Sequence, residues 1–335
     1  MQKMLSVLEG KNLTPPPIWL MRQAGRYLPE YREIRAQAGD FLSLCFNPEW
    51  ASEVTLQPIR RYDLDAAIIF SDILVTPYAL GQEVRFVAGE GPKLGELNID
   101  KLHYKPELLD PVYEALSRTR TALPEDKTLI GFCGAPWTVA CYMVEGGSSK
   151  DWQKARLMAQ TNREAFAALI DQLVEISAHY LCSQIEAGAN CVQIFDSWSG
   201  ALSESEFEKW VIEPTRNIIK SVRAKYPETP IIGFPKGAGA KAQRYVKETG
   251  VNAIGLDTSV PLDQAQDLQR FCPVQGNLDP IALLTGGTHL TLEVNRILDS
   301  LSDGPMIFNL GHGVIKETSP ENVAQVVEMV RNYKR

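Results

Sequence analysis

Short β-rich segments alternate with longer amphipathic segments along the whole chain, and this alternation constrains the fold more than any other feature. It predicts parallel strands joined by helical crossovers, because a parallel connection must cross the face of the sheet. The β-rich segments are 18–23, 65–72, 128–134, 191–196, 230–235, 251–257, 273–277 and 306–310. Eight such segments within 335 residues predict an α/β fold of the (β/α)8 TIM-barrel class, with a single domain over residues 1–335.

Two connecting segments carry patterns of their own. Between strands the apolar spacing changes to the helical period, as in 162–185, where the residues that fall mainly on one face are Phe166, Leu169, Ile170, Leu173, Ile176 and Leu181. After the second β-rich segment, residues 83–86 alternate in polarity and are followed by the glycine-rich residues 88–95. We expect a hairpin there rather than a phosphate-binding loop, because the Gly-Lys-Ser/Thr ending of such a loop is missing.

Charge and hydropathy exclude several classes of partner. The net charge is −7, from 34 Lys and Arg against 41 Asp and Glu, and no basic stripe reverses it, so we expect no nucleic-acid binding. No apolar run approaches the roughly 18 residues of a membrane span, so we expect no membrane association. Residues 1–17 lack the basic and apolar pattern of a leader segment, which predicts a cytoplasmic location.

The cysteines and histidines favour reduced thiols over a metal centre. Six cysteines occur without a C-x-x-C pair, several of them in apolar surroundings, which is typical of buried thiols in a reducing compartment. Only four histidines are present, and we find no paired motif of the kind that zinc sites use. We therefore expect no metal site, and an anionic small molecule would need a local basic pocket.

The first β-rich segment is followed by a cluster of arginines. Arg22, Arg26, Arg32 and Arg35 lie within fourteen residues of an acidic chain. A guanidinium group binds carboxylates bidentately and keeps its charge, so the cluster is a candidate anion site, favoured at Arg22 and Arg26 by the intervening glycine. The alternative is a charged surface helix in which the neighbouring glutamates, at positions 30 and 33, pair with the arginines.

Polar residues also end the other β-rich segments, where the loops of a barrel converge on its active site. Asp72 could be a general acid, a stabiliser of a cation or only a cap of the turn. His312 lies between two glycines, which would let the ring approach a ligand closely, although a Gly-His-Gly turn can also be structural.

Three further residues are weaker candidates. Tyr142 lies in an apolar segment, where most tyrosines are core residues. Ser197 has no Gly-x-Ser-x-Gly context, so a hydrogen-bonding role is the better interpretation than a nucleophilic one. Lys236 could contact an anion or form a Schiff base, and we favour a structural or ion-pair role because nothing in the sequence indicates a depressed pKa.

In combination these residues give the chain a resemblance to the uroporphyrinogen decarboxylase family. Each matching segment is weak alone, but together they follow in order over nearly the whole length. The segments are Trp-Leu-Met-Arg-Gln-Ala-Gly-Arg-Tyr-Leu-Pro-Glu-Tyr at 19–31, Ile-Phe-Ser-Asp-Ile-Leu at 69–74, Gly-Ala-Pro-Trp-Thr at 134–138, Tyr-Met-Val-Glu-Gly-Gly at 142–147, Gly-Asn-Leu-Asp-Pro at 276–280 and Asn-Leu-Gly-His-Gly at 309–313. The loop after His312 departs from the pattern, because a proline expected near Lys316 is absent.

The resemblance implies a homodimeric barrel without a cofactor that removes the acetate carboxyls of uroporphyrinogen III in porphyrin (heme and chlorophyll) biosynthesis, releasing carbon dioxide and coproporphyrinogen III. It makes Asp72 the central catalytic residue and gives Arg22, Arg26, Tyr142 and His312 catalytic roles, with one arginine as a candidate proton relay. The substrate-binding positions that it implies are Arg22, Gln23, Ala24, Gly25, Arg26, Phe41, Asp72, Tyr142, Ser197 and His312.

Two other functions can be weighed against this one. A corrinoid-dependent methyltransferase of similar fold would need zinc held by histidine and cysteine, and residues 233–237 offer no His-x-Cys there. A tetrapyrrole carrier could keep the pocket and lose the reaction. The intact arginines, Asp72, Tyr142 and His312 argue against a carrier.

Overall fold

The computed structural model describes residues 2–87 and 89–334. Seven strands form one parallel sheet in the order β1-β4-β5-β6-β7-β8-β9, and two more form a separate antiparallel hairpin. The strands are β1 (Ala66–Ile68), β2 (Val84–Val87), β3 (Gly91–Leu94), β4 (Thr128–Gly134), β5 (Cys191–Asp196), β6 (Ile231–Pro235), β7 (Ala253–Gly255), β8 (Val274–Leu278) and β9 (Met306–Leu310).

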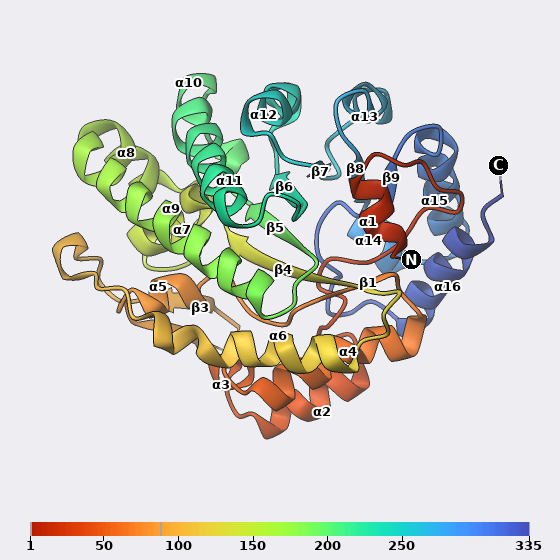
Figure 1. The fold of residues 1–335 in the computed structure, drawn as a ribbon, viewed down its shortest axis with the longest axis horizontal. Coiled ribbons are helices and arrows are strands. Elements are labelled where there is room, and N and C mark those ends of the chain that lie inside the picture. Colours follow the sequence, from red (N-terminus) through yellow and green to blue (C-terminus); the bar gives the residue numbers. More distant parts are fainter. Residues whose placement is uncertain (1, 88, 335) are drawn as a thin grey trace.

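Helices form an outer ring around the strands (Figure 1). They are α1 (Lys3–Leu8), α2 (Pro29–Gln37), α3 (Phe41–Cys45), α4 (Pro48–Tyr62), α5 (Val75–Ala79), α6 (Asp110–Ala122), α7 (Pro136–Glu145), α8 (Gln153–Thr161), α9 (Arg163–Glu186), α10 (Glu204–Phe207), a π-helical turn (Glu208–Ile212), α11 (Glu213–Lys225), α12 (Ala242–Thr249), α13 (Leu262–Gln269), α14 (Pro280–Thr285), α15 (Gly287–Leu301) and α16 (Pro320–Asn332). Within the described residues, no helix is both long enough and apolar enough to cross a bilayer.

The predicted parallel barrel is confirmed, but its first strand is reduced to a single bridge. Ile18 pairs in parallel with Phe308 of β9, and on its other side its carbonyl accepts a hydrogen bond from Asp65 N (2.9 Å). Ile18 therefore occupies the eighth place between β9 and β1. The strand expected over 18–23 stops there because side chains replace the ladder: Leu20 N donates to Gln23 Oε1, and Met21 N donates to Asn309 Oδ1.

The second expected strand, 65–72, is also shorter than predicted. The ladder ends when Ile69 N donates to Ile130 O (3.0 Å), because Phe70 N donates instead to Thr55 Oγ1 of helix α4 (2.9 Å). Asp72 consequently lies on the loop after β1 rather than on the strand. The chain after Ile69 is free to turn over the end of the barrel.

Other local expectations are confirmed. Helix α9 spans Arg163–Glu186, and all six apolar residues expected on its inner face are buried. The hairpin β2–β3 pairs Val84 with Leu94, although Ala88 of its predicted glycine-rich segment lies outside the described residues. All six cysteines are buried free thiols.

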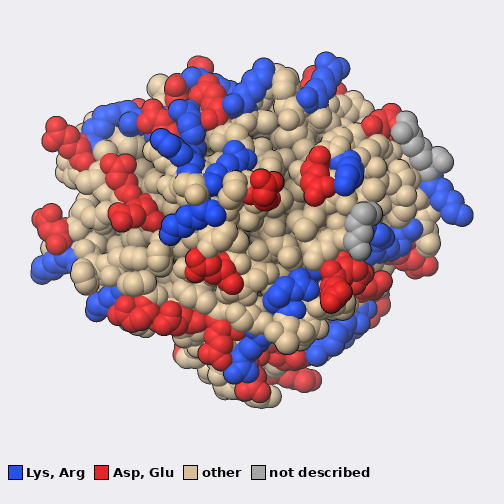
Figure 2. Space-filling model, viewed as in Figure 1, with Lys and Arg blue, Asp and Glu red and all other residues tan. Residues whose placement is uncertain are grey.

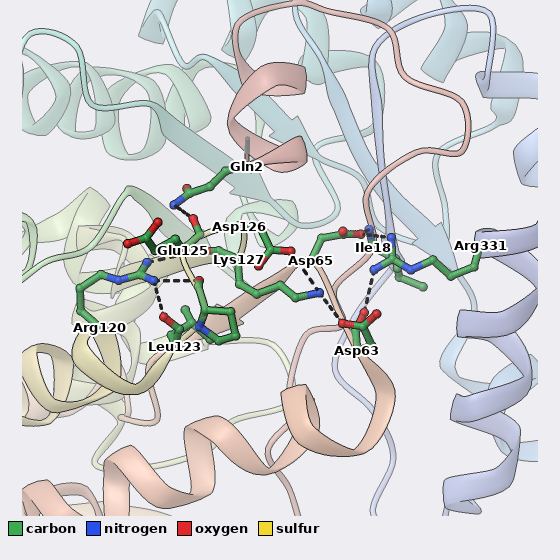
Figure 3. A network of polar contacts seen from close by, with 11 residues as sticks. Gln2, Ile18, Asp63, Asp65, Arg120, Leu123, Glu125, Asp126, Lys127 and Arg331 are labelled. Carbon is green, nitrogen blue, oxygen red and sulfur yellow. Dashed lines mark hydrogen bonds and ion pairs between the residues drawn. The ribbon is translucent and has the colours of Figure 1, made fainter.

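The N-terminal ends of the strands are covered by helix α1 and a polar network. Met4, Val7 and Leu8 pack on residues at the strand starts, such as Ile232 and Ile307. Beside them, Asp65 joins distant parts of the chain, because its Oδ2 accepts a hydrogen bond from Ile18 N (2.8 Å) and pairs with Arg331 of helix α16 (2.9 Å) (Figure 3). At this end of a barrel, polar contacts serve stability.

The surface seen from this side carries both signs of charge. Lysines and arginines are interspersed with aspartates and glutamates around a broad neutral centre, and neither sign forms a continuous patch (Figure 2). This face therefore offers no basic patch for an anion.

We predict that Asp65→Ala lowers the free energy of unfolding by about 2–4 kcal/mol, because it leaves the half-buried Arg331 without its partner and Ile18 N without an acceptor. Urea unfolding followed by circular dichroism measures the loss. Lys11→Ala is the control, since it removes an ion pair whose two side chains are exposed. A loss for Asp65→Ala no larger than that of the control would contradict the role of Asp65 in closing the barrel.

Candidate active site

Arg22 is fixed at the C-terminal end of the barrel by a strained turn. Its φ is +60°, a left-handed conformation that costs energy for any residue with a side chain. The turn is held by the buried side chain of Gln23, which accepts a hydrogen bond from Leu20 N (3.0 Å) and donates one to Ala66 O (3.0 Å). The amide of Gln23 is thus used inside the turn, while the guanidinium of Arg22 is exposed.

The stem of Arg22 lies directly against Gly313. A β-carbon at Gly313 would overlap Cδ and Cγ of Arg22, so any larger residue would displace the arginine from this position. The positive charge of Arg22 lowers the pKa values of Asp72, Tyr142 and His312. It opposes the effect of burial at Asp72 and Tyr142 and adds to the effect of burial at His312. The structure therefore brings four of the residues predicted from the sequence to one place.

Asp72 is the acidic group of this site. Its Oδ1 accepts a hydrogen bond from Leu74 N (2.8 Å), and no other hydrogen bond to its carboxylate is found within the described residues. Burial raises its pKa from 3.8 to about 6, because the loss of hydration outweighs the stabilising effects of Leu74 N and Arg22. The residue is half-buried, so part of its surface is still accessible to a ligand. It acts as a turn cap and still has acceptor capacity for a ligand.

Tyr142 and Ser197 lie beside a wall of tryptophans. The ring of Tyr142, on helix α7, makes edge contacts with Trp152 (5.1 Å between centroids) and Trp198 (6.2 Å). Burial raises the pKa of Tyr142 to about 12, and the nearby Asp72 carboxylate adds to the effect, so its hydroxyl is a hydrogen-bond donor at neutral pH. Ser197 directly follows β5, is half-buried and precedes Trp198.

His312 is neutral over the whole physiological range. Burial lowers its pKa to about 4, and the positive charges of Arg22 and Lys236 lower it further. Its ring stacks on Phe234 of β6 (6.5 Å, 13° between planes). Its Nδ1 is buried and has no hydrogen-bond partner within the described part of the chain, so its hydrogen-bonding capacity is unused by the protein.

Phe41, Ala24 and Gly25 complete the set of predicted positions. Phe41 begins helix α3 and contacts Phe70 (5.7 Å) and Phe86 (4.6 Å), forming an apolar flank two residues from Asp72. Ala24 and Gly25 are half-buried in the turn after Arg22, where a β-carbon on Gly25 would come within 3.0 Å of Arg22 O. These residues shape the rim of the site with backbone and apolar surface.

The remaining arginines line a basic groove next to this turn. Its volume is about 580 Å³, and its lining residues are Arg26, Arg32, Arg35, Ala36, Gly39, Lys316 and Glu317. The alternative of a salt-bridged surface helix is wrong for Glu30, which pairs with Arg61 of helix α4 (2.8 Å) rather than with any of these arginines. Within the described chain, Arg22, Arg26, Arg32 and Arg35 form no ion pair with an acidic side chain.

Two buried residues of this region were missed by the sequence reasoning. Thr138 Oγ1 donates to Asp196 Oδ1 (2.5 Å) and accepts a hydrogen bond from Trp198 N (3.1 Å), which fixes the segment that carries Ser197. Burial raises the pKa of Asp196 to about 7. No sequence signal links Thr138 to Asp196, because the contact depends on the pairing of β4 with β5.

This parallel barrel places the unpaired Arg22 near the half-buried Asp72 at its C-terminal end, with further unpaired arginines in a neighbouring groove, and these are the features of an enzyme site that takes an anion. The chain belongs to the uroporphyrinogen decarboxylase family, whose family model (URO-D) matches residues 1–333. Among relatives, it is 55% identical over 336 residues to a uroporphyrinogen decarboxylase of Agrobacterium fabrum, covering 99% of this chain and 98% of the relative. It is 52% identical to the enzyme of that name from Rhodospirillum rubrum, covering 98% and 96%.

Solved structures extend the similarity of fold to other chemistry. A methyltransferase from Methanosarcina mazei superposes with a TM-score of 0.80 at 19% identity, covering 98% of this chain and 97% of that one. A B12-independent methionine synthase from Shewanella superposes with a TM-score of 0.57 at 10% identity, covering 95% and 94%. At these identities the likeness concerns the barrel alone. Within the described residues, no group of three or more His, Cys, Asp and Glu side chains is arranged to hold a metal.

We predict that Asp72→Asn is more stable than the unmodified protein at pH 8. The folded state holds the pKa of Asp72 above its unfolded value, so ionisation disfavours the folded state above pH 6 and has no effect below pH 4. Asparagine removes this penalty, and the gain should be about 1–3 kcal/mol at pH 8 and vanish near pH 4. Thermal unfolding across this pH range measures it.

Asp40→Asn is the matched control for this measurement. The pKa of Asp40 is lowered, chiefly because its carboxylate accepts a hydrogen bond from the Ser43 side chain, so its ionised form favours the folded state. No gain in stability is expected from this variant at pH 8. A gain of equal size in both variants would show that the effect does not come from burial of Asp72.

Proposed function

We propose that this protein decarboxylates the acetate side chains of uroporphyrinogen III, giving coproporphyrinogen III and carbon dioxide. The observation that carries the proposal is the arrangement of Arg22 beside Asp72, Tyr142 and His312, with the electrostatic field of one guanidinium reaching all three. Membership of the uroporphyrinogen decarboxylase family supports the same reaction. The site residues named from the sequence are part of this proposal.

The substrate's own ring accepts the electrons of the reaction. A proton adds to a ring carbon of a pyrrole and makes it a cation. The bond between the acetate methylene and its carboxyl then breaks, its electron pair neutralises the cation, and carbon dioxide leaves. Protonation of the remaining methylene and loss of the ring proton give the methyl group, so one proton is consumed for each acetate. A pyridoxal or thiamine group is not needed for this chemistry.

Asp72 stabilises the cationic ring in this scheme. Its carboxylate can accept hydrogen bonds from the pyrrole N–H groups at the centre of the macrocycle, and its negative charge favours the cation formed on protonation. Because only Oδ1 is engaged by Leu74 N, the carboxylate can do this without losing its place in the turn. The interaction is stronger in the transition state than in the ground state because positive charge develops on the ring, and the fold holds the carboxylate in place beforehand.

The other residues bind the acidic rim of the substrate. The unpaired guanidinium groups of Arg22 and Arg26 are exposed and can take carboxylates without breaking an existing ion pair. Tyr142 donates from its hydroxyl, while the neutral His312 donates from one ring nitrogen. Ser197 lies beside them as a further hydrogen-bonding group.

The homodimer and the cytoplasmic location also remain proposals. The family resemblance motivates the homodimer, and the six buried free thiols accord with a reducing compartment. Sedimentation of the purified protein tests the dimer.

The reaction is tested by incubating the purified protein with uroporphyrinogen III under anaerobic, metal-free conditions and counting the carboxyls on the product. Formation of coproporphyrinogen III with release of carbon dioxide is the expected result. Binding without carbon dioxide release would instead identify a carrier. Stoichiometric zinc in the purified protein, without decarboxylation, would favour a methyltransferase.

Asp72→Asn should lower kcat by about a hundredfold or more, because it removes the negative charge that stabilises the cationic ring. In the unmodified protein, kcat/KM should fall on the acid side with a pKa of about 6 as Asp72 becomes protonated. Steady-state rates from pH 5 to 8 measure both. Undiminished activity in a folded Asp72→Asn variant would defeat the assigned role.

A further inference from the structure

Lys236 lies across the barrel from Arg22. It directly follows β6, and β6 is four places from the Ile18 segment in either direction around the barrel: through β1, β4 and β5, or through β9, β8 and β7. The two cations consequently stand on opposite sides of the same opening. His312 lies near enough to both cations for the charge of each to lower its pKa.

The backbone of Lys236 is held firmly in this position. Lys236 N donates to Asp196 O (3.0 Å), and Lys236 O accepts hydrogen bonds from Gly200 N (3.0 Å) and Ser199 Oγ (2.9 Å). These contacts tie the end of β6 to the loop after β5. The side chain therefore starts from a fixed point at the rim of the site.

The ammonium group of Lys236 has no acidic partner among the described residues. The sequence favours a structural or ion-pair role; the described residues provide no ion pair, and Nζ lies over the ring of Trp198, 5.4 Å from its centroid. Asp196 at the end of β5 and Asp257 after β7 make no ion pair with Lys236: Asp196 Oδ1 accepts a hydrogen bond from Thr138, and Asp257 accepts from Gly237 N (2.6 Å) and Ser259 N (2.8 Å). An aromatic face holds a cation more weakly than a carboxylate does.

We propose that Lys236 binds a carboxylate of the substrate, on the side of the macrocycle opposite to the carboxylates bound by Arg22 and Arg26. This inference rests on the proposed function. A macrocycle with acid groups around its whole rim needs cations on more than one side, and Arg22, Arg26, Arg32 and Arg35 all belong to the chain that follows the Ile18 segment. Lys236 supplies the missing charge and leaves the face of Trp198 when the substrate enters.

Lys236→Met tests the proposal, with Lys236→Arg as the variant that keeps the charge. We expect Lys236→Met to raise KM by about ten- to a hundredfold, the usual effect of losing one hydrogen bond to a charged group, with kcat changed by less than about threefold. Lys236→Arg should restore KM to within about threefold. The dependence of kcat/KM on salt should also weaken in Lys236→Met.

Lys241→Met is the matched control. Lys241 is also half-buried and holds its ammonium over an aromatic ring, 4.6 Å from the centroid of Phe207, while donating to Leu202 O (2.9 Å). It differs in lying in the turn before helix α12 instead of at a strand end. An unchanged KM in Lys236→Met, or an equal rise in Lys241→Met, would overturn the proposal.

Inhibition by coproporphyrinogen III distinguishes the two kinds of carboxylate. If Lys236 binds a propionate, Lys236→Met weakens product inhibition as much as it raises KM, because the product keeps its propionates. If it binds an acetate, only KM rises. Both outcomes support a carboxylate contact. The contact is refuted if Lys236→Met changes neither KM nor product inhibition.

A measurement on the unmodified protein applies even where a variant does not fold. Lysines are acetylated with and without saturating uroporphyrinogen III, which carries both acetates and propionates, under anaerobic conditions, and the modified residues are quantified by mass spectrometry. Lys236 should be protected severalfold and Lys241 should not. Equal acetylation of Lys236 with and without ligand would refute the contact. Absence of turnover in the unmodified protein would refute the proposed function, whereas turnover with an indifferent Lys236 would refute only this inference.

Discussion

The whole architecture depends on one short contact, the bridge of Ile18 between β9 and β1. A seven-stranded parallel sheet would have two open edges, and exposed edges invite pairing with other chains. Here the gap is filled by a segment that begins with three prolines and can offer few backbone donors. Side chains make up the deficit: Asp65 holds the amide of Ile18, and Asn309 holds the amide of Met21. Because these side chains end the strand hydrogen bonding at this point, the chain can turn at Arg22 across the C-terminal end of the barrel.

The distribution of paired and unpaired charge is the second principle of the molecule. Acidic residues outnumber basic ones, so a shortage of acidic residues does not explain why a lysine or arginine lacks an acidic partner. Glu30 lies close in sequence to four arginines and still pairs with Arg61 of another helix. Cations at the strand ends thereby keep their charge for a ligand, and the favourable interaction with a polyanion is not reduced by the loss of existing ion pairs.

The sequence predicts the buried strands of this fold better than the places where a strand ends early. Strands β4, β5 and β9 match the predicted bounds, because long apolar runs bounded by turn residues have no alternative that buries them as well. The predicted strands over 18–23 and 65–72 are too long. The first ladder is ended by the side chains of Gln23, within the same segment, and of Asn309, from β9, and the second by Thr55 of helix α4. For the site, the polar residues at strand ends were visible in the sequence. The sequence did not reveal that the charge of Arg22 acts on Asp72, Tyr142 and His312 together, nor did it reveal the contact of Thr138 with Asp196.

The fit of Arg22 against Gly313 has a consequence for biosynthesis. These residues come from the two ends of the chain, and the bridge partner Phe308 lies with them near the last strand. While the ribosome is still making the chain, the earlier strands can pair with one another, but the turn at Arg22 has neither the strand nor the glycine that receives it. The binding site is therefore completed only by the last part of the chain, and a truncated chain lacking β9 and the residues after it has neither His312 nor the glycine against which Arg22 packs.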